Sequence, residues 1–309
     1  MNIIITGGLG HIGSKLILSL NKIEKLKKVY IIDCAKSNNL NVLFNLKFKK
    51  IKIWFIQKDL LNDKILYEIK DKIDVVIHLA SITNAEASFK IKKQIYLNNY
   101  GIFKNIVKFC ISKKSHLIHL SSTSIYGRQS SLVDEDCKDL KPQSPYANIK
   151  FLEEKILIKN TKKLKFITLR LGTITGISQG MRFHTAVNKF CFKTVLRESI
   201  PVWNNAIDQY RPYLSLDDSI KTILLIINRK KFDNQIYNVL TSNHTVRQIL
   251  SMIKKLKYKI NIIKTKSPIL NQNSYKVSRE KIEKFKIRFN KNIFKDIKET
   301  LNLKKNSLL

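Results

Sequence analysis

The sequence predicts a doubly wound α/β fold, in which helices cover both faces of a parallel β-sheet. Short apolar runs rich in β-branched residues alternate with longer amphipathic stretches through the first half of the 309-residue chain. Such runs are typical of parallel strands that are buried on both faces, and their alternation with helices favours a doubly wound sheet. The expected strands are 2–6, 28–33, 52–57, 74–80, 116–122 and 166–172, and the expected helices between them include 12–26, 94–113 and 146–160.

The net charge is high, but its distribution does not indicate a specific nucleic-acid partner. Lys and Arg number 58 against 23 Asp and Glu, which gives +35 and would by itself suggest an anionic partner. The lysines are scattered over the whole chain among many Asn and Ile residues, as an A-T-rich coding sequence would produce. Nucleic-acid readers usually gather their basic residues in one patch. Specific nucleic-acid binding therefore remains an alternative that only this charge supports.

The cysteines and the N-terminus indicate a cytoplasmic protein without a metal site. The four cysteines are far apart, and none has the spacing of a zinc site. The opening "MNIIITGG" has neither a basic n-region nor a long apolar h-region. No apolar run approaches the roughly 18 residues that a membrane span needs. We therefore expect reduced thiols, no bound metal and no membrane insertion.

A glycine-rich motif predicts a dinucleotide site after the first strand. "TGGLGHIGS" (6–14) places Gly7, Gly10 and Gly13 three residues apart at the start of a helix. This spacing allows a sharp turn, a close approach to a pyrophosphate and tight helix–strand packing. Asp33 ends the second strand, where a carboxylate can accept both ribose hydroxyls and repel a 2′-phosphate. The motif therefore predicts NAD, although Asp33 could instead be a cap or turn residue.

A second motif points to proton-transfer chemistry. In "SPYANIK" (144–150), Tyr146 and Lys150 are four residues apart and share one face of a helix. An adjacent ammonium stabilises the phenolate form of a tyrosine in a partly dry cleft, which makes that tyrosine a useful base near neutral pH. The alternative without catalysis is an amphipathic helix that carries an aromatic residue and a solvated lysine.

Together these motifs resemble the extended short-chain dehydrogenase/reductase family, in particular its NAD-dependent sugar-nucleotide epimerase/dehydratase branch. The resemblance covers nearly the whole chain. It rests on the order and spacing of "TGGLGHIG", "HLA" (78–80), "SSTSIYG" (121–127), "PQSPYANIK" (142–150), "LRLGTITG" (169–176) and "RPYLSLDD" (211–218).

The resemblance implies a Rossmann fold with two domains. Residues 1–175 would form the NAD-binding domain. Residues 176–309, where the apolar pattern loosens, would form mainly the smaller substrate-binding domain. A segment around 212–240 would return to the first domain. Members of this family usually form homodimers through helices that correspond to about 94–113 and 146–160.

The resemblance also implies a role for each matching residue. Tyr146 would be the catalytic acid/base and Lys150 would bind the nicotinamide ribose. Ser122 would hold the reacting oxygen, and Asn98 would support the local hydrogen bonds. The implied cofactor-binding residues besides Tyr146 and Lys150 are Gly7, Gly10, His11, Ile12, Gly13, Asp33, Asp59, Leu60, Leu79 and Ala80. The implied substrate-binding residues are Ser122, Thr173, Arg182 and Arg211.

Departures from the family pattern narrow the expected reaction. Dehydratases of this branch carry an acidic pair directly after the position of Ser122, but Thr123 and Ser124 stand here. Thr173 replaces an asparagine that often contacts the substrate diphosphate. We therefore expect an NAD-dependent nucleotide-sugar epimerase, most like the UDP-galactose 4-epimerases. The alternatives are a nucleotide-sugar oxidoreductase or dehydratase and a nonenzymatic NAD-sensing or nucleic-acid-binding protein.

For two further side chains, Arg211 and His184, the sequence leaves a choice open. Arg211 is expected to bind the diphosphate, but a structural salt bridge with Asp217 or Asp218 is the alternative. His184 is expected to be a loop or packing residue and not a catalyst.

Overall fold

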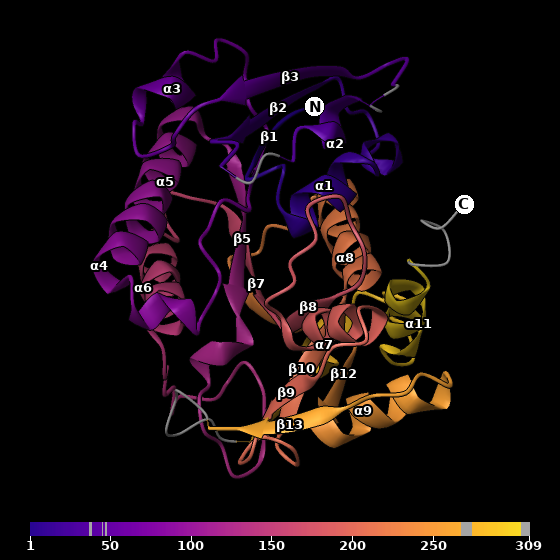
Figure 1. Cartoon of the computed structure of the whole chain (residues 1–309). Coiled ribbons are helices and arrows are strands. Elements are labelled where there is room, and N and C mark those ends of the chain that lie inside the picture. The colour runs from indigo at the N-terminus through magenta and orange to yellow at the C-terminus, as the bar shows by residue number, and fades with distance from the viewer. Residues whose placement is uncertain (37–38, 45, 47, 267–273, 304–309) are drawn as a thin grey trace.

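The chain is built around a seven-stranded parallel sheet with the strand order β11-β7-β5-β4-β1-β2-β3 (Figure 1). The computed structural model describes residues 1–36, 39–44, 46, 48–266 and 274–303. All six pairings in this sheet are parallel, which confirms the doubly wound fold. The strands are β1 (Asn2–Thr6), β2 (Lys28–Asp33), β3 (Lys52–Gln57), β4 (Val75–His78), β5 (His116–Ser122), β7 (Phe166–Leu171) and β11 (Ile236–Val239).

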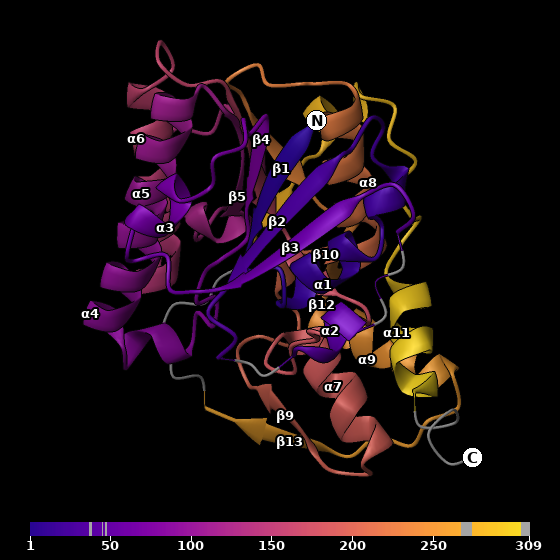
Figure 2. The same ribbon diagram turned by 90° about the horizontal axis from the view of Figure 1, so that it is seen from above.

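Both faces of this sheet are covered, which explains the continuous apolar runs of its strands. In β1, Ile3 and Ile5 face one hydrophobic core, whereas Ile4 between them faces the other. Figure 2 shows the two helical layers on opposite sides of the sheet. One layer contains α3 (Lys64–Tyr67), α5 (Gly101–Lys113) and α6 (Pro145–Lys159), and the other contains α1 (His11–Ile17), α8 (Leu216–Asn228) and α10 (Glu280–Glu283).

The helix expected over 12–26 is wrong in length. α1 ends at Ile17, and only a short 3-10 turn, η1 (Leu20–Lys22), follows it. Ser19 donates its hydroxyl to the carbonyl oxygen of Lys15 at 3.1 Å, and Lys25 has a φ of 55°. Ser side chains compete with backbone hydrogen bonds, and a left-handed residue cannot continue a helix. The apolar period alone did not reveal this stop.

The helix expected over 94–113 is interrupted by a π-helical turn. It divides into α4 (Lys92–Ile95), the π-helical η3 (Tyr96–Tyr100) and α5. Such turns insert a residue into a helix and shift the side chains that follow. The helix expected over 146–160 is α6, which Ser144 caps by accepting a hydrogen bond from the Ala147 N–H at 3.1 Å.

The C-terminal lobe packs against the carboxyl edge of the sheet and has its own hydrophobic core (Figure 1). We use this name for the elements that build that core and the small sheets beside it. The helices are α7 (Ala186–Val195), α9 (Val246–Lys255) and α11 (Phe294–Asn302). The strands are β8 (Thr173–Thr175), β9 (Ile200–Trp203), β10 (Tyr210–Ser215), β12 (Ser242–Thr245) and β13 (Ile262–Thr265), and β6 (Leu132–Val133) pairs with β14 (Lys276–Val277) nearby.

The chain crosses between the lobe and the main sheet more than once. After β10, α8 packs on the main sheet and β11 pairs with β7 at its edge. The chain then returns to the lobe through β12 and α9. Within the described ranges, no helix is long and apolar enough to cross a membrane.

Candidate active site

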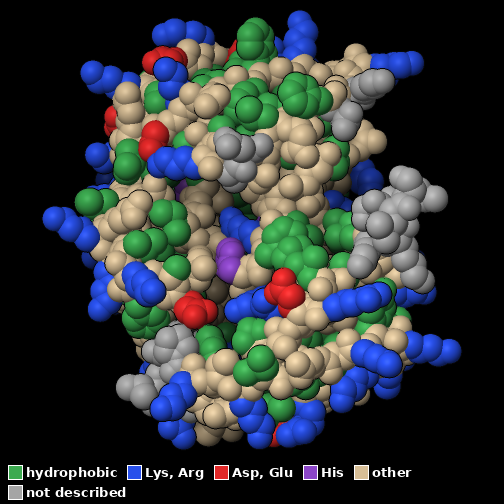
Figure 3. Space-filling model, viewed as in Figure 1, with side chains coloured by type: hydrophobic (Ala, Val, Ile, Leu, Met, Phe, Trp, Pro, Cys, Tyr) green, Lys and Arg blue, Asp and Glu red, His purple; other side chains and the backbone are tan. Residues whose placement is uncertain are grey.

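A cavity of about 390 Å³ opens between the carboxyl ends of the parallel strands and the C-terminal lobe (Figure 3). Open parallel sheets place ligand sites at this edge, where the loops after neighbouring strands diverge. Gly7 after β1, Leu79 after β4, Ser122 at the end of β5 and Leu171 at the end of β7 all line the cavity. The glycine-rich motif, "HLA" and "SSTSIYG" therefore all contribute residues to the lining of one cavity.

The glycine-rich loop is packed too closely for side chains at two of its positions. Gly7 has a φ of +68°, and a Cβ there would lie 2.6 Å from the Ala80 nitrogen. A Cβ at Gly13 would lie 2.5 Å from the Gly7 carbonyl oxygen. The Thr6 hydroxyl accepts hydrogen bonds from the Leu79 and Ala80 N–H groups at 3.1 and 3.2 Å. The loops after β1 and β4 are thus held together along the edge of the cavity.

His11 connects this loop to the C-terminal lobe. Its ring is 2% exposed, and Nε2 lies 2.8 Å from the Gly176 carbonyl oxygen. Burial lowers the pKa of His11 to about 4, so the ring is neutral and Nε2–H donates to that carbonyl. Gly10, Ile12 and Gly13 line the cavity beside it.

The remaining residues that the sequence assigned to the cofactor lie outside the lining of the cavity. The Asp33 carboxylate, at the end of β2, accepts hydrogen bonds from the Leu9 and Ala35 N–H groups at 3.0 and 2.9 Å. Asp59 caps its own loop by accepting from the Leu61 N–H at 3.0 Å. The Leu60 side chain is buried in the core under α5, and its carbonyl oxygen accepts a hydrogen bond from the Asn105 side chain at 3.0 Å.

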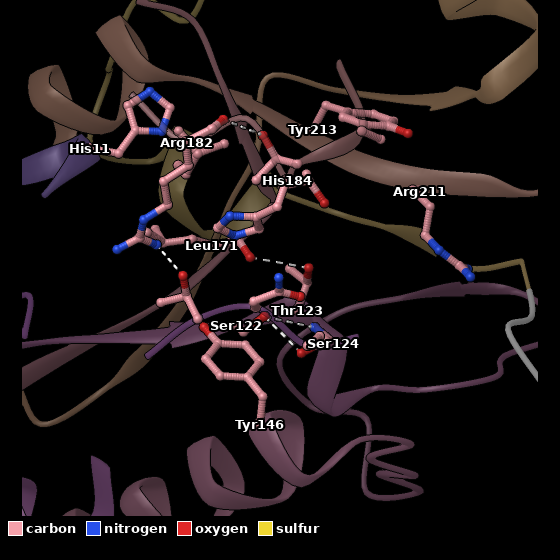
Figure 4. Close-up of a pocket in the computed structure, with 18 of the residues that line it drawn as sticks. His11, Ser122, Thr123, Ser124, Tyr146, Leu171, Arg182, His184, Arg211 and Tyr213 are labelled. Atoms are coloured by element: carbon pink, nitrogen blue, oxygen red, sulfur yellow. Dashed lines mark hydrogen bonds between the residues drawn. The ribbon is translucent and has the colours of Figure 1, made fainter. Parts of the chain in front are cut away.

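Ser122, Tyr146 and Lys150 meet at the cavity. Tyr146 projects from the first turn of α6 into the cavity beside Ser122, and Arg182 lies across from it (Figure 4). The Ser122 Oγ lies 2.8 Å from Ser124 Oγ and accepts from the Ser124 N–H at 3.2 Å. Lys150 is one helical turn after Tyr146, also lines the cavity, and is only 3% exposed.

Lys150 forms a buried ion pair with Glu153 on the same helix. The Lys150 Nζ donates to Glu153 Oε2 at 2.8 Å, and the same oxygen lies 2.9 Å from His119 Nε2. Burial disfavours the charge on Lys150, but attraction to Glu153 and then Tyr146 outweighs it and raises the pKa of Lys150. Burial lowers the pKa of His119, so that its ring is neutral. The sequence prediction missed Glu153 and His119, whose contact joins residues 34 positions apart.

A second buried pair holds the strands beneath the cavity. Arg170 on β7 donates to both oxygens of Glu154 on α6 at 2.7 and 3.0 Å. Its third contact is to the Tyr126 hydroxyl at 2.9 Å, which in turn donates to Asn238 on β11. Ser121 also donates to Glu154 at 2.6 Å. This network fixes β5, β7, β11 and α6 relative to one another.

Asn98, to which the sequence prediction gave a supporting role, lies next to a buried amide, Asn99, that the prediction did not name. Asn98 lies outside the lining of the cavity and donates to the Asn99 side-chain oxygen at 3.1 Å. Asn99 is 1% exposed and makes two hydrogen bonds of 2.9 Å with the backbone N–H and carbonyl of Ile82. Both asparagines stand in the π-helical turn η3, and Asn98 is joined to the loop after β4 through Asn99.

Besides Lys150, three cationic side chains line the cavity: Arg182, Lys189 and Arg211. Arg211 on β10 stacks over the Tyr275 ring at 5.1 Å and donates to the Gln209 side-chain oxygen at 3.3 Å. The alternative salt bridge is not formed, because Asp217 pairs with Lys15 and Lys295 and Asp218 pairs with Lys221.

Arg182 is closer to the reacting end. It donates to the Thr83 hydroxyl and lies next to Tyr146 and the glycine-rich loop. Thr173 at the start of β8 lines the same space. His184 lines it too, and burial with the charge of Arg182 lowers the pKa of His184 to about 4.

Acidic side chains are scarce around the cavity. Among the described lining residues, Glu86 is the only carboxylate, and the sequence analysis did not identify it. Thr123 is buried and its hydroxyl donates to the Leu171 carbonyl oxygen at 3.2 Å. In the described part of the chain, no group of three or more His, Cys, Asp or Glu residues could hold a metal ion.

Known proteins with a similar sequence or fold include both epimerases and dehydratases. A dTDP-D-glucose 4,6-dehydratase from Dictyostelium discoideum is 30% identical over 77% of this chain and 57% of its own length. A UDP-glucuronic acid 4-epimerase from Bacillus cereus, solved with UDP-glucuronic acid and NAD, has a TM-score of 0.86 at 23% identity, covering 99% and 100% of the two chains. A dTDP-glucose 4,6-dehydratase from Streptomyces venezuelae has a TM-score of 0.87 at 17% identity, covering 99% and 97%.

The family itself is shown by a match over most of the chain. The model of the NAD dependent epimerase/dehydratase family matches residues 3–239, which include the glycine-rich loop, Ser122, Tyr146, Lys150 and Arg211. The chain belongs to the NAD-dependent epimerase/dehydratase family, and its cofactor is NAD.

Proposed function

We propose that this protein is an NAD-dependent epimerase that inverts C4 of a nucleotide-activated hexose or of its uronic-acid relative, with UDP as the expected nucleotide. One observation carries the proposal. Ser122, Tyr146 and Lys150 converge at a single cavity, while hydroxyl side chains and not carboxylates occupy positions 123 and 124. Inversion at a carbinol needs a proton acceptor, a hydride acceptor and room for the sugar to turn, whereas loss of water needs an additional acid and base.

The residues along the sheet edge fit NAD. A cradle in which a Cβ at Gly7 or Gly13 would strike backbone suits the close passage of a pyrophosphate. The Asp33 carboxylate ends β2 where the adenosine ribose is expected, and its charge disfavours a 2′-phosphate. When bound, NAD accepts a hydride from the sugar carbon and returns it.

The side chains of this chain supply the proton chemistry. Tyr146 takes the proton of the sugar hydroxyl, and Ser122 holds the oxygen as it becomes a carbonyl. The Lys150 ammonium stabilises the negative charge that develops on Tyr146. Arg211 and Lys189 anchor the diphosphate, so the sugar ring can rotate and present its other face while the nucleotide stays bound.

Arg182 favours an anionic sugar over a neutral one. It lies beside Tyr146 at the sugar end of the cavity, away from the Arg211 end where the diphosphate is placed (Figure 4). A guanidinium there pairs with a carboxylate better than with a hydroxyl group. The likeness to the UDP-glucuronic acid 4-epimerase of Bacillus cereus supports the same substrate class.

Dehydration is the second candidate reaction. Glu86 is an acidic side chain at the cavity, and the first dehydratase relative is 30% identical to this chain. A single carboxylate can serve as one of the two groups that water loss requires. The epimerase remains favoured because Thr123 is tied to the Leu171 carbonyl and offers no ionisable group.

A product assay separates these reactions. The protein is incubated with UDP-, GDP- and dTDP-hexoses and with UDP-glucuronic acid, and the products are identified by NMR. We expect an epimer without net NADH, formed fastest from a UDP-sugar. A deoxy-keto sugar would establish the dehydratase, and stoichiometric NADH would establish a net oxidoreductase. The variant Arg182→Leu tests the substrate class: it should reduce turnover of the nucleotide-linked uronic acid more than turnover of the neutral hexose.

We also propose that the protein is a cytoplasmic homodimer. Tyr96 and Leu97 in η3 and Ile158 on α6 expose 45%, 55% and 57% of their area on neighbouring helices. A second copy pairing through these helices would cover them. Analytical ultracentrifugation tests the pairing, and Leu97→Glu with Ile158→Glu should give a monomer.

A further inference from the structure

Lys150 lines the cavity but is paired with a buried carboxylate, Glu153. Lys150 is 3% exposed and Glu153 is fully buried, and they share a hydrogen bond of 2.8 Å one turn apart on α6. His119 on β5 lies 2.9 Å from the same carboxylate oxygen, and its Nδ1 lies 3.3 Å from the Thr168 hydroxyl. A neutral His119 therefore donates Nε2–H to Glu153 and accepts from Thr168.

Stability does not explain this pair. Replacing a buried ion pair by apolar residues is often neutral or stabilising, because removing two charges from water is costly. The other oxygen of Glu153, Oε1, is buried and has no hydrogen-bond partner among the described residues. The carboxylate is thus retained at a cost, with both of its hydrogen bonds directed to Oε2 by Lys150 and His119.

We propose that Glu153, oriented by His119, is a positioning residue that keeps the buried Lys150 side chain charged and aimed at the cavity beside Tyr146. The proposal rests on the proposed function, in which that charge stabilises the tyrosinate. The pKa of a fully buried ammonium without an anionic partner can fall by about 3–5, which would bring the pKa of Lys150 close to or below 7 and remove much of its charge at pH 7.

The other groups around Lys150 cannot replace Glu153. His78 on β4 is hydrogen-bonded to Thr6, and burial lowers the pKa of His78 to about 3, so it carries no charge. His119 is likewise neutral. Glu154 on α6 is bound by Arg170. Phe103 on α5, which is fully buried, packs against both histidine rings at 5.7 and 4.7 Å.

The direction in which Tyr146 responds tests the proposal. Tyrosine ionisation is followed by NMR in the NAD-bound protein labelled with ¹³C at the tyrosine ζ carbon, and Tyr146→Phe assigns the signal. In Glu153→Leu and Glu153→Gln, the pH at which Tyr146 ionises should rise by about one unit or more, because Lys150 becomes neutral. If Lys150 kept its charge without Glu153, loss of the negative charge would lower that pH. A fall or no change would overturn the proposal.

One control variant and one conservative variant show whether the change in Tyr146 ionisation comes from the lost charge of Glu153. Glu283→Gln removes an exposed carboxylate that pairs with Arg279 outside the lining of the cavity, and it should leave Tyr146 ionisation unchanged. Glu153→Gln preserves the shape of the side chain and an acceptor for Lys150, so it carries the test if Glu153→Leu does not fold. The NMR signal needs no turnover, so a failure of the epimerase assay leaves this result readable. If the enzyme is active, kcat/KM at pH 7 should fall about tenfold in Glu153→Leu and in Glu153→Gln.

Discussion

His11 Nε2 donates a hydrogen bond of 2.8 Å to the Gly176 carbonyl oxygen and so ties the glycine-rich loop to the first turn of the C-terminal lobe. Two more bonds reinforce the contact. The Ser178 hydroxyl donates to the His11 carbonyl at 2.9 Å, and the Gly180 N–H donates to the Ser14 hydroxyl at 3.1 Å. The segment that follows β8 therefore lies directly over the loop that is expected to hold the pyrophosphate of NAD.

Breaking this tie should loosen the cofactor. His11→Leu leaves the buried Gly176 carbonyl without its donor, at a cost of about 1–3 kcal/mol. We expect NAD to dissociate about five- to tenfold faster, as measured by stopped-flow displacement with excess fluorescent NAD analogue. Ser19→Ala, which removes a hydroxyl from the far end of the same helical region, is the matched control and should change nothing. An unaltered dissociation rate in His11→Leu would show that the contact is not part of cofactor retention.

Removing the phenolic oxygen of Tyr146 should abolish turnover while leaving the fold intact. Tyr146→Phe keeps the ring on α6 and deletes only the group that exchanges the proton. The expected loss is about 10²–10⁴-fold in kcat, with NAD binding and thermal stability unchanged. Calorimetry and circular dichroism provide the two controls. More than about a hundredth of wild-type activity would be incompatible with Tyr146 as general acid/base.

The charge of Asp33 should set the preference between the two nicotinamide cofactors. Its carboxylate is fixed by the Leu9 and Ala35 N–H groups at the end of β2, where the adenosine ribose is expected. Asp33→Asn keeps the shape but removes the charge that repels a 2′-phosphate. Titration calorimetry should show that the ratio of NAD affinity to NADP affinity falls by about tenfold in this variant. Tighter binding of NADP than NAD by the wild type would refute this assignment.

The buried Asp296 should make stability fall as pH rises toward neutrality. Burial, together with Asp217, Asp218 and Glu299, raises the pKa of Asp296 from 3.8 to about 7, although Ser215 donates to it. A raised carboxyl pKa means that the contribution to folding is full below about pH 4 and is lost as pH rises to about 7.

Asp296→Asn removes this dependence. Relative to the wild type, the free energy of unfolding of the variant should increase between pH 4 and 7, on the order of 2–4 kcal/mol, and stay level above pH 7. Chemical denaturation at several pH values measures the difference. The exposed Asp208, whose pKa is lowered by its hydrogen bond to Arg247, is the control, because Asp208→Asn should show no gain. A pH-independent difference for Asp296→Asn would contradict the prediction.

The sequence predicted the features that depend on neighbours along the chain. Every expected strand is present within two residues of its predicted bounds. Burial on both faces explains the continuous apolar runs of the central strands, whereas the edge strand β3 is partly exposed. Gly7, Gly13, Tyr146 and Lys150 all line the cavity, and their motifs are visible in the sequence because each needs a fixed spacing on one loop or one helical turn.

Features that depend on contacts across the fold were missed. His119 and Glu153 come into contact only when β5 and α6 pack together, and nothing in the sequence around either residue identifies them as partners. Asn99 was not identified, because its partners on the Ile82 backbone come from the loop after β4. Glu86 lies on a loop without regular periodicity, so only the folded chain shows that it lines the cavity.

The fate of the hydrogen on C4 of the sugar tests the central claim most directly. The NAD-bound protein is incubated with UDP-glucose and UDP-glucuronic acid that carry deuterium at C4, and NMR locates the label in the product. Epimerisation through a keto-sugar returns the hydride to the carbon it left, so we expect the C4 epimer with deuterium retained at C4. Deuterium found at C6 of a deoxy-keto sugar, or released on free NADH, would contradict the account.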